Sequence, residues 1–260
     1  MELIKSDDTE YEEYENLLLE RDQIQKEAGQ IWTAYVIEFG QLISDVYEEQ
    51  LECVKCKKMI SYYQNAINHG SIIDQDAMQA WLDKEMASYY AELSRLQKEN
   101  EECRNSGEST AYEVQRSKTL YRRLAKLIHP DINPETDRQE KLTDLWQRIV
   151  TAYHHNDVKE LSELEVLVRK VMADLGQGDI KVDIPDIDEK IASLKEDIQK
   201  IIHTDPYTYK DLLDDDKAVM KKKSNLEEQL KSYQEYHKEM DAEIQKMITS
   251  GGITLKWRMK

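Results

Sequence analysis

The feature that most constrains this chain is a stretch from about Asp7 to Asn68 that contains no proline and no turn-forming cluster. Apolar residues recur in it every three or four positions, at Ile24, Ala28, Ile31, Tyr35, Phe39, Leu42 and Val46. Because an α-helix turns once every 3.6 residues, this spacing places them on one face of a single long helix. Such a stripe must be covered by other helices, so the sequence predicts an all-α fold.

A second helical stripe follows a break at "NHGSIID", residues 68–74. Gly70 suits a helix C-terminus, and Ser71 or Asp74 suits the next N-cap. The second stripe comprises Met78, Leu82, Tyr89, Leu93, Leu96 and Cys103. Since a short connection favours antiparallel neighbours, residues 1–106 are predicted to form an N-terminal coiled-coil helical arm.

Three further segments follow this arm. Residues 107–176 hold the most distinctive motif, described below, and end in a helix from about Asp157 to Leu175. Residues 177–185 are predicted to be a linker, and residues 186–260 a C-terminal helical hairpin arm interrupted at Pro206. The sequence therefore predicts an elongated all-α protein in which coiled-coil helical hairpins flank a central antiparallel helical hairpin. Its end, "GGITLKWRMK", is compatible with a short strand or a frayed basic tail.

The composition argues against several classes of partner. Thirty-six basic and 53 acidic residues give a net charge of −17, which disfavours binding to nucleic acid or to anionic membranes. No run approaches the roughly 18 apolar residues of a membrane span, and the acidic start lacks the apolar region of a secretory signal. Three cysteines do not describe a disulfide framework. We therefore expect a cytoplasmic protein.

A basic stretch stands out against this acidic background. Between Arg116 and Ile128 there are five basic residues and no acidic one, and Leu120, Leu124 and Leu127 recur at helical spacing among them. The basic residues are Arg116, Lys118, Arg122, Arg123 and Lys126. This pattern predicts an amphipathic helix with a basic face. A solvated face that only offsets the acidic arms is the alternative interpretation.

A rigid polar turn follows this helix. Pro130 cannot continue it and biases His129 away from helical geometry. Asp131, Asn133 and Pro134 favour a tight turn. Thr136 or Asp137 could then cap a returning helix. The apolar face of that helix is Leu142, Leu145, Trp146, Ile149, Ala152 and Tyr153. We expect two antiparallel helices with the His-Pro-Asp loop exposed at their tip.

The sequence "YRRLA", followed by "HPDINP" and then by "LWQRIVTAY", resembles the J-domain of DnaJ-type co-chaperones. The resemblance covers the hairpin, about residues 116–155. The family's opening helix has no counterpart upstream of the hairpin, and no glycine-rich region or module of four Cys-x-x-Cys pairs follows it. The match is therefore to a J-like hairpin placed between two helical arms.

The resemblance implies that the hairpin docks on the ATPase domain of a seventy-kilodalton heat-shock chaperone and stimulates its ATP hydrolysis. The residues that it implies for docking are His129, Pro130, Asp131, Tyr121, Arg122, Arg123, Lys118, Lys126 and Asn133. The chain would then be a co-chaperone or adaptor with no catalytic residues and no cofactor, whose arms hold an unknown client or a second copy of the chain. The alternative function is a non-catalytic coiled-coil scaffold in which the hairpin is only structural.

Other sites are disfavoured by the sequence. Cys53 and Cys56 have the spacing of a zinc or redox pair, but only His69 and Cys103 could complete a zinc site, and both cysteines continue the apolar stripe. We therefore expect no metal. His154-His155 likewise lacks further metal ligands. The net charge opposes a helix-turn-helix DNA reader, and an enzyme built on His129 and Asp131 would lack a nucleophile.

Overall fold

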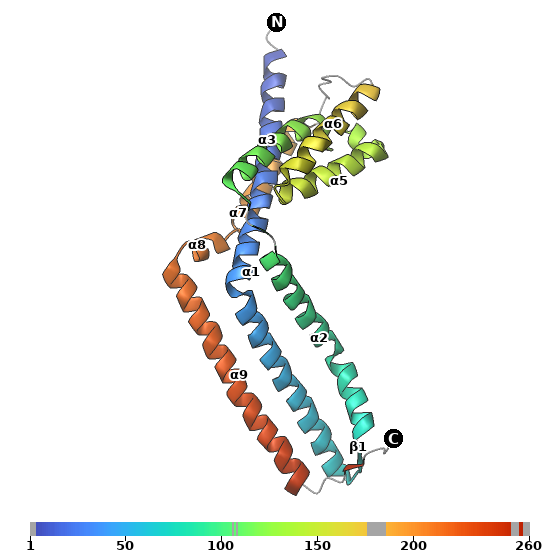
Figure 1. The fold of residues 1–260 in the computed structure, drawn as a ribbon, viewed down its shortest axis with the longest axis vertical. Helices are drawn as coiled ribbons and strands as arrows, with labels where there is room; N and C mark the ends of the chain where they lie inside the picture. The colour runs from blue at the N-terminus through green and yellow to red at the C-terminus, as the bar shows by residue number, and fades with distance from the viewer. Residues whose placement is uncertain (1–3, 106, 108, 176–185, 251–254, 257–260) are drawn as a thin grey trace. The chain divides into compact units, whose positions relative to one another are not determined.

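The computed structural model describes residues 4–105, 107, 109–175, 186–250 and 255–256, and helices dominate these ranges (Figure 1). The helices are α1 (Ile4–His69), α2 (Gln75–Asn105), α3 (Ala111–Ile128), α4 (Glu135–Arg138), α5 (Glu140–His154), α6 (Val158–Asp174), α7 (Ile187–Ile202), α8 (Tyr209–Leu213) and α9 (Asp216–Ser250). Two short strands, β1 (Ile73–Asp74) and β2 (Leu255–Lys256), pair in parallel. The prediction of an all-α fold is confirmed.

The chain divides into two compact units. Unit 1 contains Met1–Ile31 and Gly107–Thr208, and unit 2 contains Trp32–Ser106 and Tyr209–Lys260. Helix α1 contributes its first part to unit 1 and its second part to unit 2. The units therefore cut across the predicted segments. The predicted linker, 177–185, lies outside the described residues.

In unit 2, α2 and α9 cover the apolar face of the second part of α1. Leu51 of α1 packs with Leu82, Met86 and Leu93 of α2. Tyr89, expected on this stripe, is 36% exposed, whereas Leu82, Met86 and Leu93 are buried. On α9, Met240, Ile244 and Met247 pack with Cys53, Cys56 and Tyr63 of α1.

The connection between α1 and α2 uses the expected turn residues. Gly70 has φ +60°, a left-handed conformation that ends α1 at little steric cost. Asp74, rather than Ser71, caps α2, since its Oδ1 accepts hydrogen bonds from the backbone N–H groups of Asp76 and Ala77. Asp74 also pairs with Lys256 in the short sheet, so the strand alternative holds at Leu255–Lys256.

In unit 1, α3, α5 and α6 surround a common core (Figure 1). Leu124, Ile128, Leu142, Ile149 and Leu161 are each 0% exposed. Trp146 packs only partly buried against this core.

Helix α7 joins unit 1 instead of forming the expected hairpin with the last helix. Ile191 and Leu194 of α7 pack on Tyr14 and Leu18 of α1. The apolar face of α7 is thus covered by the first part of α1, whereas α9 belongs to unit 2. Across the described ranges, no helix has the length and apolarity needed to cross a lipid bilayer.

Gly40 marks a close approach of α1 and α2. Asn100, only 8% exposed, donates from its side-chain amide to the Gly40 carbonyl at 2.9 Å and to Ser44 Oγ at 2.7 Å. A Cβ atom at position 40 would lie 2.1 Å from Asn100 Oδ1. The absence of a side chain at this position therefore lets a buried polar residue join the two helices.

We expect Gly40→Ala to destabilise the protein by about 1–3 kcal/mol, because the added methyl group must push Asn100 out of its hydrogen bonds. Gly29→Ala is the matched control on the same helix, since nothing lies within 4 Å of the position that its methyl group would occupy. It should instead stabilise by up to about 1 kcal/mol through helix propensity. Urea unfolding measures the change in unfolding free energy for both variants. Equal changes in Gly40→Ala and Gly29→Ala would contradict the close approach of α1 and α2 at Gly40.

Candidate functional site

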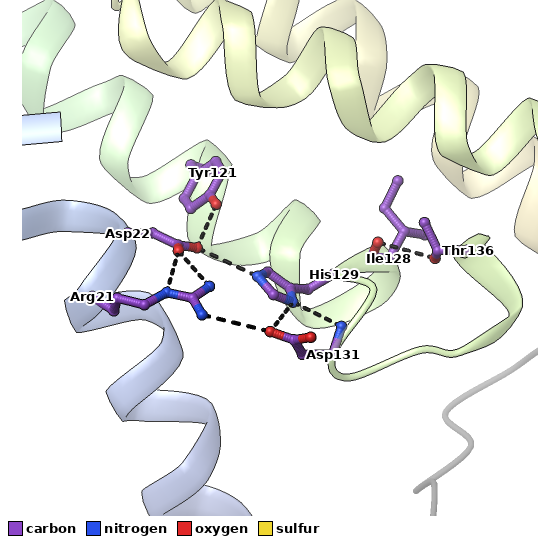
Figure 2. Close-up of polar contacts among 7 residues, drawn as sticks. All are labelled: Arg21, Asp22, Tyr121, Ile128, His129, Asp131 and Thr136. Atoms are coloured by element: carbon purple, nitrogen blue, oxygen red, sulfur yellow. Dashed lines mark hydrogen bonds and ion pairs between the residues drawn. The ribbon is translucent and has the colours of Figure 1, made fainter. Parts of the chain in front are cut away.

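The His-Pro-Asp loop is fixed at both ends by hydrogen bonds. Asn133 Nδ2 donates to the Leu127 carbonyl at 3.0 Å, and Asn133 Oδ1 accepts from the Glu135 N–H at 3.1 Å. Thr136 Oγ1 donates to the Ile128 carbonyl at 3.0 Å (Figure 2). Asn133 therefore supports the turn, as expected. Thr136 does not cap the return helix, because α4 intervenes before α5 begins after Gln139.

His129 is not at an exposed tip. It is 4% exposed, and its ring lies edge-on to Trp146 with ring centroids 4.7 Å apart. Its Nδ1 accepts from the Asp131 backbone N–H at 3.1 Å, so the proton of the neutral ring lies on Nε2, which is 3.5 Å from Asp22 Oδ2. The expectation of an exposed loop is wrong for His129, because α1 lies over it (Figure 2). The side chain of Asp131 remains 45% exposed.

Asp22 of α1 is the centre of the polar contacts at the loop (Figure 2). The Tyr121 hydroxyl donates to Asp22 Oδ2 at 2.6 Å, and Arg21 Nη2 pairs with Asp22 Oδ1 at 2.9 Å. Arg21 also reaches Asp131, with Nη1 3.7 Å from Oδ2. Burial alone would raise the pKa of Asp22, but the hydrogen bonds from His129 and Tyr121 and the charge of Arg21 outweigh it and lower this pKa.

Lys26 provides a second polar anchor one turn further along α1. It is 5% exposed, and its Nζ donates to Asn156 Oδ1 at 2.5 Å and to Ser117 Oγ at 3.4 Å. The ammonium also lies 3.8 Å from the ring centroid of Tyr153. Burial, together with the charge of Lys118, lowers the pKa of Lys26 to about 8. These contacts make α1 part of the hairpin's own domain.

Sequence reasoning missed these residues of α1. Asp22 and Lys26 lie off the apolar stripe, and Arg21, like them, stands among many charged residues of similar appearance. The partners of Lys26 are 91 and 130 residues away along the chain. A local pattern carries no signal for such contacts.

The basic face of α3 is partly neutralised within unit 1. Arg123 lies 3.1 Å from Glu165, and Lys126 lies 2.8 Å from Glu15. Lys118 and Arg122 form no ion pair with any residue that the structure describes; Arg122 is exposed and Lys118 half-buried. Tyr121 is 3% exposed. Its ring, expected beside the docking face, is thus part of the core.

The predicted cysteine pair is buried as expected, with Cys53 2% and Cys56 4% exposed. Within the described ranges, no group of three metal-binding side chains joins either cysteine to His69 or Cys103.

Comparisons with protein-family models, with curated proteins and with solved structures give no match to this chain. The relation to J-domains remains a prediction that rests on the residues and geometry of the hairpin.

We expect Asp22→Asn to lower the free energy of unfolding by roughly 2 kcal/mol at neutral pH, because it weakens hydrogen bonds to a buried charged acceptor. The pKa of Asp22 is lowered by folding, so its charge stabilises the fold above the unfolded pKa of about 4. That contribution is lost as the pH falls through the folded-state value. The difference in unfolding free energy between wild type and variant should therefore become smaller at acidic pH.

Urea unfolding at a series of pH values checks this expectation. Tyr121→Phe removes one donor and leaves the carboxylate charged, so it should cost less than Asp22→Asn. Equal free energies of unfolding for wild type and Asp22→Asn at neutral pH would contradict a stabilising role for the Asp22 charge. A difference between them that stays constant as the pH is lowered would contradict it as well.

Proposed function

We propose that the hairpin is a J-like docking element that binds the ATPase domain of a seventy-kilodalton heat-shock chaperone and stimulates its ATP hydrolysis. In this proposal the protein is a cytoplasmic co-chaperone or adaptor without catalytic residues of its own. Its remaining helices hold a client or a second copy of the chain.

The observation that carries the proposal is the position of the Asp131 carboxylate. The backbone N–H of Asp131 is fixed on the buried ring of His129, while its side chain is 45% exposed. The carboxylate already lies 3.7 Å from a guanidinium nitrogen, that of Arg21. A rigid, accessible carboxylate with this geometry suits the recognition of a cation on a partner.

Lys118 and Arg122 support the proposal through their charge. They lie four residues apart on α3 and therefore on one helix face. Neither is neutralised by an ion pair among the described residues, whereas Arg123 and Lys126 are paired. In a chain with net charge −17, such a local positive face orients an acidic partner surface and speeds encounter.

His129 and Tyr121 act as positioning residues in this proposal. Both are buried, and both contact Asp22. Their role is to hold the loop at a fixed place relative to α1.

Docking at Asp131 requires the partner cation to replace Arg21. The Arg21–Asp131 pair is monodentate and partly exposed, so it contributes at most about 1 kcal/mol. Leu18 and Leu19 are 0% and 5% exposed, and they hold α1 in place independently of that pair. The exchange therefore needs a change of side-chain position at Arg21, without displacement of α1.

One observation favours the alternative function, a scaffold in which the hairpin is structural. The loop uses His129, and in part Asp131, for contacts with α1 of the same chain. A scaffold would need only these internal contacts and would leave the activity of the chaperone unchanged.

We expect Asp131→Asn to weaken the stimulation of the host chaperone's ATPase. Losing a charged interface contact costs about 2 kcal/mol or more, roughly thirtyfold in affinity. Folding should hardly change, because the side chain is nearly half exposed and its only Arg contact among the described residues is the weak pair with Arg21. Asp137→Asn, an exposed carboxylate on neighbouring α4, is the matched control and should stimulate as the wild type does. Steady-state ATP hydrolysis measures all three proteins; a wild type without stimulation at any concentration or salt supports the scaffold instead.

We expect Arg21→Gln to stimulate the same ATPase at lower concentration, by up to about fivefold, because the internal competitor for Asp131 is removed. Arg138→Gln serves as the control, since it removes an exposed Arg that pairs with Glu135. The measurement is the concentration that gives half-maximal stimulation, with melting curves for each variant. Loss of stimulation in Arg21→Gln at unchanged stability would refute the exchange.

A further inference from the structure

Three side chains with metal-binding atoms meet between α1 and α9 in unit 2. They are Cys56 of α1 and His237 and Asp241 of α9, and their ligating atoms all lie within 4.8 Å of one another. Cys56 Sγ is 3.4 Å from Asp241 Oδ1, and His237 Nε2 is 3.6 Å from Asp241 Oδ2. The donors of a tetrahedral zinc ion lie about 3.3–3.6 Å apart, given bonds of about 2.0–2.3 Å. The two separations, one to each oxygen of the Asp241 carboxylate, are close to that range, and 4.8 Å is the upper bound for all three pairs of donor atoms.

A carboxylate orients the histidine of this group. His237 Nδ1 lies 2.5 Å from Glu49 Oε1 of α1. With Nδ1–H donating to Glu49, the lone pair of the neutral ring is on Nε2, the nitrogen that faces Asp241. A carboxylate behind the non-ligating nitrogen is the usual arrangement of metal-binding histidines.

Among the described residues, Cys53, the neighbouring buried cysteine, has no metal-binding side chain as its hydrogen-bond acceptor, and it serves as a comparison for Cys56. Cys53 lies one turn before Cys56 and is equally buried, but its thiol donates to the backbone carbonyl of Tyr233 at 3.4 Å. Cys56 instead faces an imidazole and a carboxylate. Both cysteines belong to one apolar cluster, which holds α1 and α9 together and keeps the donor atoms in place.

Nucleophilic chemistry does not explain the group. Burial, with the hydrogen bond to Asp241 and its charge, raises the pKa of the Cys56 thiol to about 12. Such a thiol is protonated and unreactive at neutral pH. The carboxylates of Asp241 and Glu49 lie beside the group and would compensate the charge of a divalent cation.

We propose that Cys56, His237 and Asp241 bind one Zn²⁺ ion. Thiolate, imidazole and carboxylate are all zinc ligands, and three of them leave a fourth position for water. Asp241 has a side chain 61% exposed, which gives the ion a path from solvent. The ion would link α1 to α9. The proposal is independent of the hairpin and of the function proposed for it.

Titration of the full-length, chelator-treated protein with Co²⁺, a spectroscopic substitute for Zn²⁺, tests the site. We expect one Co²⁺ per chain, with a sulfur-to-cobalt charge-transfer band and the visible bands of tetrahedral coordination. Added Zn²⁺ should abolish both. Cys56→Ser should lose the charge-transfer band, whereas the matched control Cys53→Ser should keep it.

Two further variants keep the test decisive if Cys56→Ser does not fold. Asp241→Asn changes a mostly exposed side chain and should weaken binding at least tenfold. Glu49→Gln removes the carboxylate behind His237 and should weaken it by about 10–100-fold. The proposal is overturned by no Co²⁺ binding at about 100 μM metal, near 10⁻⁴ M in affinity, by binding without a sulfur band, or by wild-type affinity in Asp241→Asn.

Discussion

The hydrogen bonds to the buried Asp22 carboxylate are the interaction on which the proposed docking site depends. The Asp22 carboxylate of α1 accepts a hydrogen bond from the Tyr121 hydroxyl of α3. It also faces His129, the residue that follows α3. These contacts determine where α3 ends relative to α1. Because Asp131 follows His129 by two residues and bonds to its ring, the position of the exposed carboxylate is set by a contact made on another helix. The loop is thus held in place by contacts with Asp22 in unit 1.

The hairpin of α3 and α5 is completed by two other helices of unit 1. The first part of α1, together with α6, supplies the apolar cover for α3 and α5, through residues such as Leu19 and Leu164. A long helix that belongs to both compact units thus completes the core around the hairpin. The same arrangement provides an internal cation, Arg21, beside Asp131. In the proposed function, a partner cation must bind Asp131 more strongly than Arg21 does in order to replace it.

Much of the fold follows from local patterns in the sequence. The helical stripes, the Gly70 turn and the antiparallel course of α3 and α5 all depend on residues close together along the chain. The burial of His129 could not be predicted this way, because Asp22, which it contacts on α1, lies 107 residues earlier. The same limit applies to Cys56, since its neighbour Asp241 is 185 residues away. Charged residues such as Asp22 carry no mark that separates a buried acceptor from a solvated one.

The central claim, that the loop and the basic face of α3 dock on the chaperone, is tested most directly by amide hydrogen exchange of the full-length protein. Exchange would be compared with and without the host's seventy-kilodalton chaperone in the presence of ATP. We expect slower exchange across residues 118–133 and no change along α9. Slower exchange confined to unit 2, or none at 118–133 under conditions in which the complex forms, would contradict it.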